Sequence, residues 1–183
     1  LIGLVGSEMC IRDSPFTMGL EVAGTITAIG PNTKSPKIGT RVTVFAGQGG
    51  LAEYGYFPAE RLIEIPDTMP SEVAAGFQVA YGTSHLALKH CAGLKKNNTL
   101  LVLGAAGGVG LTAVELGKYF GAQVLAAARG KEKLKIAQEF GADVLIDTNT
   151  DNLVEVVKSL GGADVVYDPI GGELFKEAMR ACK

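Results

Sequence analysis

The second half of the chain alternates between short, continuously apolar runs and longer stretches in which apolar residues recur at helical spacing. The apolar runs have the length of buried strands and occupy residues 100–103, 122–128, 144–146 and 163–167. Amphipathic stretches separate and follow them, at residues 111–120, 131–140, 153–160 and from 171 onward. Gly141 is predicted to end the second of these helices in a left-handed conformation. Continuous apolar strands that alternate with helices are typical of a parallel sheet covered on both faces. This half is therefore predicted to be an α/β domain with a doubly wound parallel sheet.

The first third of the chain has shorter runs, which proline and glycine interrupt repeatedly. Strands are predicted at residues 20–30, 41–45, 52–57 and 62–65. Short strands joined by tight turns favour a small, partly open β-barrel. Residues 71–91 then have a helical pattern that leads into the α/β half, and Ser71 is predicted to cap the first helix.

A glycine-rich segment joins the first apolar strand of the α/β half to the helix that follows. Read as G-x-G-x-x-G, it becomes Ala105-x-Gly107-x-x-Gly110, with alanine in place of the first glycine. Glycines in such a turn let the backbone approach a pyrophosphate, and the start of the helix offers free N–H groups and a positive dipole end. The strand–turn–helix context predicts a dinucleotide site. The alternative is a parallel α/β domain that binds no nucleotide.

The charges after the second apolar strand indicate which dinucleotide is bound. NAD-type sites have Asp or Glu about 20 residues beyond the first glycine, where it holds the ribose hydroxyls. Here the strand leads into Arg129, Lys131 and Lys133, and Glu132 is predicted to point elsewhere. Arginine grips a phosphate with a planar fork and lysine adds a point charge. NADP(H) is therefore favoured over NAD(H). The alternative is an ordinary solvated basic helix start.

Six motifs occur in an order that points to a known family: Pro15–Gly24, Gly39–Val42, Ala52–Tyr54, Tyr81–Ser84, Gly104–Gly110 and Asp168–Gly172. Together they resemble the medium-chain dehydrogenase/reductase superfamily, and within it the zinc-free quinone oxidoreductase (zeta-crystallin-like) branch. The resemblance covers residues 15–183. It implies a GroES-like β-barrel followed by a Rossmann domain, and NADPH-dependent reduction of quinones or α,β-unsaturated carbonyls (enones).

The resemblance also implies roles for individual residues. The residues that match the pyrophosphate-binding turn are Ala106, Gly107, Gly108 and Val109. Arg129 and Lys133 fall where relatives contact the 2′-phosphate of NADPH. Thr83 matches a threonine near the nicotinamide, although it could simply be a helix-capping hydroxyl. Many relatives have a tyrosine where this chain has Thr148, so one expected cofactor contact is lost. No catalytic residue is identified, because the cofactor supplies the hydride and the protein orients the two rings.

Zinc chemistry is not expected. Zinc-dependent members of the superfamily have Gly-His-Glu where this chain has Gly19-Leu20-Glu21, and leucine cannot bind a metal. A cysteine-rich structural zinc lobe is also missing from the sequence. His85 and His90 are interpreted as surface or capping histidines.

Residues 4–14 match, codon for codon, the translation of a transposon adapter used in sequencing libraries, so residues 1–14 are predicted to be non-native. Residues 15–92 are then assigned to a GroES-like barrel remnant with its linking helix, and residues 93–183 to the first four strands of a Rossmann NADP-binding domain. Both domains are expected to be incomplete. We therefore expect this chain to be unstable or aggregation-prone and inactive, and its full-length parent to be the enzyme; the family resemblance allows that parent to be a homodimer.

Composition fits a soluble enzyme of the cytoplasm. The chain has 17 basic and 19 acidic residues, a near balance that favours neither nucleic acid nor a membrane surface as partner. Outside the adapter-like segment it has Cys91 and Cys182, far apart, as expected in a reducing compartment. Two alternative functions stay open: an enoyl-thioester reductase of the same superfamily, and a non-catalytic nucleotide-binding (crystallin-like) protein.

Overall fold

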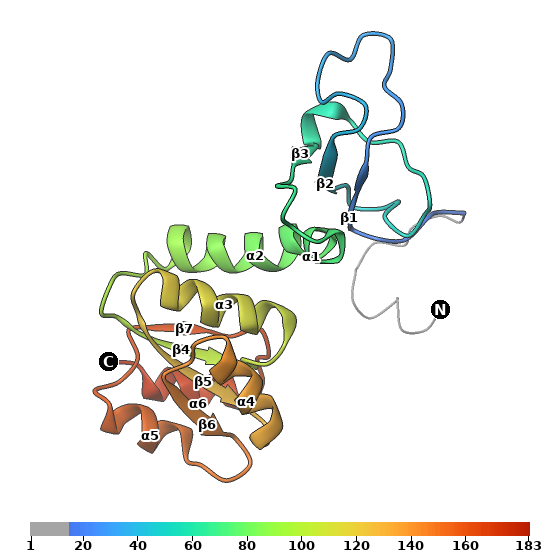
Figure 1. The fold of residues 1–183 in the computed structure, drawn as a ribbon. Coiled ribbons are helices and arrows are strands. Elements are labelled where there is room, and N and C mark those ends of the chain that lie inside the picture. Colours follow the sequence, from blue (N-terminus) through green and yellow to red (C-terminus); the bar gives the residue numbers. More distant parts are fainter. Residues whose placement is uncertain (1–14) are drawn as a thin grey trace. The chain divides into compact units, whose positions relative to one another are not determined.

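A computed structural model describes residues 15–183, which its internal contacts divide into two units (Figure 1). The first unit ends at Val79 and the second begins at Ala80, within helix α2 (Phe77–His85). The domain boundary after residue 92 stays a prediction. Residues 1–14, with their predicted adapter origin, lie outside the described residues.

The first unit contains a three-stranded antiparallel sheet in the order β1-β2-β3. Its elements are β1 (Glu21–Thr25), β2 (Arg41–Phe45), the 3₁₀ turn η1 (Ala59–Arg61), β3 (Ile63–Glu64) and α1 (Ser71–Ala75). The central strand β2 is buried from Val42 to Val44. The Thr43 hydroxyl within it donates to the carbonyl oxygen of Ala74 at 2.9 Å, which fastens α1 to the sheet.

Two local predictions for the first unit were wrong. Residues 52–57 do not join the sheet: residues 52–56, Tyr54 and Tyr56 among them, are all exposed, so neither face of the segment is buried as a strand of a packed sheet would be. Ser71 is the first residue of α1 rather than its cap, which is Pro70. The Ser71 hydroxyl instead accepts a hydrogen bond from Arg41, whose guanidinium also binds carbonyl oxygens of residues 66, 67 and 69.

The second unit is a four-stranded parallel sheet in the order β6-β5-β4-β7. Its strands are β4 (Thr99–Leu103), β5 (Gln123–Ala128), β6 (Val144–Asp147) and β7 (Val165–Tyr167). The connecting helices are α3 (Gly108–Tyr119), α4 (Lys131–Glu139), α5 (Leu153–Ser159) and α6 (Glu173–Ala181), and the π-helical turn η2 (Leu86–Cys91) precedes β4. Gly141 follows α4 with a φ of +101°, as predicted.

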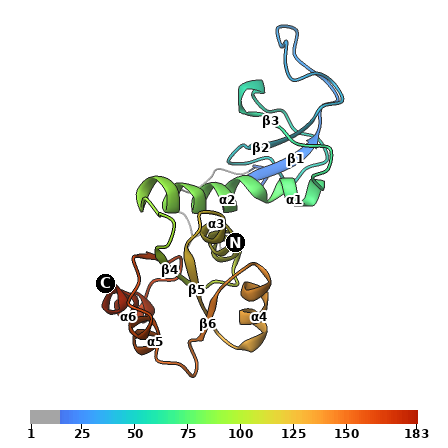
Figure 2. The ribbon, with the colours of Figure 1, turned by 60° about the vertical axis from the view of Figure 1, so that its left-hand side comes forward.

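Alternate residues of β4 and β5 belong to different halves of the core, which shows that the sheet is covered on both faces. Leu100 and Val102 pack with α3 and α4, whereas Leu101 and Leu103 pack with α5 and α6. Figure 2 shows α5 and α6 on one side of the strands and α4 on the other. The chain winds from β4 outward to β6 and then crosses to β7 on the other side of β4. The predicted doubly wound, Rossmann-type sheet is therefore confirmed.

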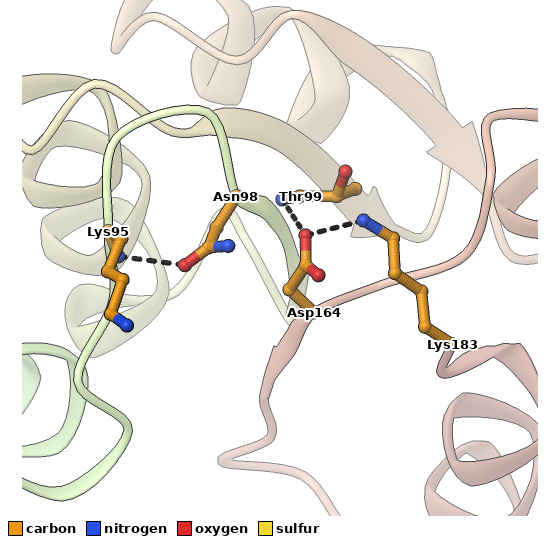
Figure 3. A network of polar contacts seen from close by, with 5 residues as sticks. All are labelled: Lys95, Asn98, Thr99, Asp164 and Lys183. Atoms are coloured by element: carbon orange, nitrogen blue, oxygen red, sulfur yellow. Dashed lines mark hydrogen bonds and ion pairs between the residues drawn. The ribbon is translucent and has the colours of Figure 1, made fainter.

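A polar network joins the amino-terminal ends of β4 and β7 (Figure 3). The Asp164 carboxylate accepts hydrogen bonds from the Thr99 N–H at 2.7 Å and from the Lys183 ammonium at 2.8 Å. The Asn98 side chain accepts from the Lys95 N–H at 2.8 Å. The Lys183 ammonium, followed by the Thr99 N–H, holds the pKa of Asp164 below its ordinary value. These contacts stabilise the amino-terminal end of the sheet, which is opposite the end where the parallel strands have their carboxyl termini.

Candidate functional site

The carboxyl ends of the four parallel strands surround a cavity of about 470 Å³. Its wall comes from the turn after β4, the end of β5 with the start of α4, Thr148 after β6, and Pro169 and Ile170 after β7. Because β5 and β7 lie on opposite sides of β4, the cavity lies where the winding direction of the sheet reverses. Open α/β sheets bind their ligands at this switch point. A second cavity, of about 460 Å³, lies within the first unit on β1 and β2.

The turn after β4 is shaped for close approach of backbone to a ligand. The Gly107 N–H donates to the carbonyl oxygen of Gly104 at 2.9 Å, and α3 starts at the next residue. A β-carbon on Gly110 would lie 2.2 Å from that same carbonyl oxygen, so no other residue fits there without moving the backbone. The first N–H groups of a helix have no carbonyl partner within it. The start of α3 therefore offers donors and a positive dipole end to an anion in the cavity.

The alanine in the glycine pattern has a structural explanation. Ala105 is fully buried, and its N–H donates to Ala127 of β5 at 3.1 Å, so it still continues the strand pairing. Gly104, one residue earlier, takes the left-handed conformation that the turn requires, with a φ of +60°. The turn glycine is thus present, displaced by one position from the register G-x-G-x-x-G.

A basic rim borders the cavity on the β5 side. Arg129 follows β5 directly, Lys133 lies in the first turn of α4, and both line the cavity and are exposed. Glu132 is exposed and is not among the lining residues, in agreement with its predicted orientation. An exposed guanidinium and ammonium beside a helix start together form a surface that suits a phosphate group.

An acidic residue that the sequence reasoning missed lies next to this rim. Asp147 ends β6 and is paired in register with Ala128 of β5. Its Oδ1 atom accepts hydrogen bonds from the N–H groups of Gly130 and Asn149, each at 3.0 Å. These two amides, together with the Lys131 ammonium, hold the pKa of Asp147 below its ordinary value. Only the β5–β6 pairing brings Asp147 here, so the one available signal was an acid at the end of a neighbouring strand.

Behind the turn lies a buried cluster of hydroxyl groups that was also not foreseen. Ser84 of α2 is fully buried, and its hydroxyl donates to the carbonyl oxygen of Val109 at 2.9 Å. The Ser84 hydroxyl oxygen also lies 2.8 Å from the Thr112 hydroxyl and 3.1 Å from the Tyr167 hydroxyl. The cluster ties α2, the start of α3 and the end of β7 together directly behind the turn.

Two family models match separate parts of the chain. Residues 3–67 match the alcohol dehydrogenase GroES-like domain, and residues 108–183 match the zinc-binding dehydrogenase family. The second match begins at the first residue of α3 and runs to the end of the chain, so β4 and residues 104–107 of the turn after it lie between the two matches. The chain belongs to the medium-chain dehydrogenase/reductase superfamily.

Within this superfamily the chain is similar to quinone oxidoreductase-like proteins, as predicted. It is 40% identical to a quinone oxidoreductase-like protein 2 homolog of Nematostella vectensis over 98% of its own length and 50% of the relative. The Escherichia coli quinone oxidoreductase, solved as a complex with NADPH, matches with a TM-score of 0.87 at 26% identity, over 95% of this chain and 55% of that one. A mycobacterial protein solved with NADPH matches with a TM-score of 0.84 at 33% identity, over 93% and 55%. The chain thus spans about half the length of the relatives it matches.

The cavity brings together most of the predicted cofactor residues of this superfamily member. Ala106, Gly107, Val109, Arg129 and Lys133 all line it. Their assignment to a cofactor remains a prediction.

Two further predicted residues do not line the cavity. Gly108 is the first residue of α3, directly beside the turn. Thr83 is exposed on α2. Two residues before it, the Tyr81 hydroxyl donates to the Glu115 carboxylate, and partial burial with that carboxylate raises the pKa of Tyr81 to about 12.

The positions considered for metal binding have other partners. The Glu21 carboxylate accepts a hydrogen bond from the Val79 N–H at 2.9 Å. The rings of His85 and His90 contact each other edge-on, with 5.5 Å between their centroids, and both residues are exposed. Among residues 15–183 no three His, Cys, Asp or Glu side chains gather as a metal site would require. Independence from zinc stays a prediction. In the same range, no helix combines the length and the apolar character needed to cross a bilayer.

Proposed function

We propose that the protein is an NADPH-dependent, zinc-independent reductase that transfers hydride to a quinone or an α,β-unsaturated carbonyl compound. The observation that carries the proposal is one cavity bordered both by a glycine turn at a helix start and by Arg129 and Lys133. The NADPH complexes of two similar solved structures support the cofactor, and the quinone oxidoreductase-like relative supports the substrate class.

The shape of the turn fits a dinucleotide. A β-carbon at Gly108 would meet no atom within 4 Å, and at Gly107 only the Gly104 carbonyl oxygen, so these glycines leave open space beside the helix start. In the proposed complex the turn residues Ala106 to Val109 hold the pyrophosphate through backbone N–H groups. Arg129 and Lys133 hold the 2′-phosphate, which distinguishes NADPH from NADH.

When bound, NADPH supplies a hydride, which with one proton from water reduces a quinone to a hydroquinone and leaves NADP⁺. The protein's own contribution in this proposal is to orient the nicotinamide and substrate rings and to exclude water from them. Thr83 is proposed to lie near the nicotinamide, as its position in the Tyr81–Ser84 motif implies. The proposal assigns no residue of this chain as a proton donor.

Replacement of Arg129 by glutamate tests the phosphate site. We expect Arg129→Glu to weaken binding of 2′,5′-ADP roughly 10- to 100-fold, the range for loss of a charge-assisted hydrogen bond, and to weaken 5′-AMP much less. Isothermal titration of the purified chain measures both. Arg180→Glu is the matched control, because Arg180 lies at the opposite end of the sheet from the cavity. It is near the carboxyl end of α6, and Cys182 just after it pairs with Ala163, which precedes β7. Equal loss of both ligands in Arg129→Glu would contradict the 2′-phosphate assignment.

Turnover separates the proposed reaction from its alternatives. Oxidation of NADPH and of NADH is followed in the presence of a chelator, with an ortho-quinone, an enone or an enoyl thioester as acceptor. Faster turnover with NADPH and the quinone supports the proposal. Turnover only with the enoyl thioester would identify an enoyl reductase, and tight NADPH binding without turnover would favour a non-catalytic role. The assay uses both this chain and a version extended to the length of its relatives, because inactivity of the chain alone is itself a prediction. A cytoplasmic location and a homodimer also remain predictions.

A further inference from the structure

The loop that carries the basic rim is held by a residue on a different strand. Gly130 lies between Arg129 and Lys131 and caps α4, yet it has no side chain with which to bind the exposed amides of the helix start. Its φ of +82° is a conformation that few other residues adopt. Its N–H donates to Oδ1 of Asp147 at 3.0 Å. The direction in which the chain leaves β5 therefore depends on Asp147.

Asp147 is itself firmly fixed. Its backbone is paired in register with Ala128, and its N–H donates to the Asp151 carboxylate at 2.8 Å. The carbonyl oxygen of Asp147 accepts from the N–H groups of Thr150 and Asp151. A tight turn after β6 thus presents the carboxylate to Gly130 in one orientation. The following residue, Thr148, donates its N–H to Ala128 at 3.1 Å and lines the cavity.

A carboxylate beside a predicted phosphate site requires an explanation, because two anions repel each other. One explanation is that Asp147 binds ribose hydroxyls directly, as an acid does in NAD sites. The hydrogen bonds favour another. Oδ1 already accepts two backbone N–H groups, and Asp147 is not among the residues that line the cavity. Its charge faces the start of α4 and the Lys131 ammonium, where a negative charge stabilises the helix.

We propose that Asp147 is a positioning residue for nucleotide selectivity: by holding Gly130 it sets Arg129 and Lys133 where they bind the 2′-phosphate. The inference rests on the proposed function and deepens it. Selectivity for the phosphorylated ribose then depends on hydrogen-bond acceptance by residue 147, and its negative charge is dispensable.

Two substitutions separate the role of residue 147 as a hydrogen-bond acceptor from the role of its negative charge. Asp147→Ala removes the acceptor, whereas Asp147→Asn keeps an oxygen that can accept from the Gly130 N–H and loses the charge. The readout is the ratio of affinities for 2′,5′-ADP and 5′-AMP, measured by titration of the full 183-residue chain. We expect Asp147→Ala to lower this ratio about fivefold, the factor that corresponds to one ordinary hydrogen bond. Asp147→Asn should keep the ratio at or above that of the unaltered chain.

Asp143→Ala is the matched control. Asp143 precedes β6 at its opposite end, where its carboxylate accepts from the Val124 N–H of β5 at 2.7 Å and pairs with Lys118 at 2.6 Å. Its loss also removes a carboxylate that binds a strand amide, but far along the strands from the basic rim. We expect this variant to lose stability and to keep the affinity ratio.

The outcomes distinguish this inference from the function on which it rests. An unchanged ratio in Asp147→Ala, with 2′,5′-ADP still preferred, would overturn the positioning role alone. Weaker 5′-AMP binding in both Asp147 variants would show that the carboxylate binds ribose itself, which also overturns it. Absence of any preference for 2′,5′-ADP in the unaltered chain would overturn both proposals. If Asp147→Ala does not fold, the affinity ratio is measured in Asp147→Ser instead. Hydrogen exchange in Asp147→Asn then shows whether residue 147 still protects the Gly130 amide, and loss of protection with an unchanged ratio would overturn the positioning role.

Discussion

At the scale of single residues, the structural roles of Ala105 and Asp147 depend on neighbours from other strands. Ala105 occupies the place of a glycine in the sequence pattern, but its N–H pairs with Ala127 and its side chain is buried. The left-handed conformation that the turn requires is adopted by Gly104. Asp147 is an ordinary strand-end acid in the sequence and becomes the acceptor for Gly130 in the structure.

Gly110 gives a prediction at this scale. Gly110→Ala places a β-carbon 2.2 Å from a backbone oxygen, which must move. We expect a loss of about 1–3 kcal/mol in the free energy of unfolding, the usual cost of overpacking, and weaker 2′,5′-ADP binding because the turn shifts. Urea unfolding and titration measure the two effects.

Gly82→Ala is the control for that substitution. Gly82 lies within α2, and a β-carbon there would meet no atom within 4 Å. Alanine is the better helix former, so this variant should be as stable as the unaltered chain or more so. A Gly110→Ala chain as stable as Gly82→Ala would show that the turn has room that the structure does not predict.

At the scale of elements, the two ends of the parallel sheet differ in the groups that they present. The amino-terminal end is closed by fixed charge pairs such as Asp164 with Lys183. The carboxyl-terminal end is open and lined by turns, a helix start and exposed basic side chains. The charge pairs of the sheet and the lining of the cavity thus lie at opposite ends of the strands.

The Asp164 network predicts a dependence of stability on pH. Because the pKa of Asp164 is lower in the folded chain than in the unfolded chain, its contribution is complete above the ordinary Asp value of about 3.9. That contribution is lost as the pH falls from there through the folded pKa. We expect the difference in unfolding free energy between the unaltered chain and Asp164→Asn to shrink on acidification from pH 5 to about pH 2. Urea unfolding across this range measures it, and a difference independent of pH would contradict the role of the charge.

At the scale of the whole molecule, the chain consists of two units with separate sheets, and the cavity at the carboxyl ends of the parallel strands belongs to the second. If the proposed function is correct, NADPH stabilises the unit that binds it. At a concentration about 100 times its Kd, a ligand stabilises the folded state by about 2.7 kcal/mol. We expect hydrogen exchange of amides in β4 and β5 to slow on addition of NADPH. Exchange that slows only in β1 and β2 would place the nucleotide in the first unit instead.

The fold of the second unit could be predicted almost completely from the sequence, and that of the first only in part. Buried parallel strands such as β4 are apolar throughout, and amphipathic helices such as α4 have a clear period, so both stand out. The stretch 52–57 alternates as a strand does, yet residues 52–56 are all exposed and the segment pairs with no strand of the sheet. Ser71 has a capping side chain, but Arg41 from a distant strand binds it. Local pattern fails where a distant partner competes.

For the second unit, the sequence by itself determined the order of strands and helices along the chain, which faces are buried, the glycine turn and the sign of the charge beside it. These properties are local, because hydrophobic period and turn chemistry act over a few residues. Only the tertiary structure decided that β6 lies beside β5 and β7 beside β4, and hence that Asp147 lies against the loop after β5 while Arg129 and Ile170 line one cavity. Parallel strands pair across long crossovers, and an apolar strand shows that it is buried without showing which strand lies beside it.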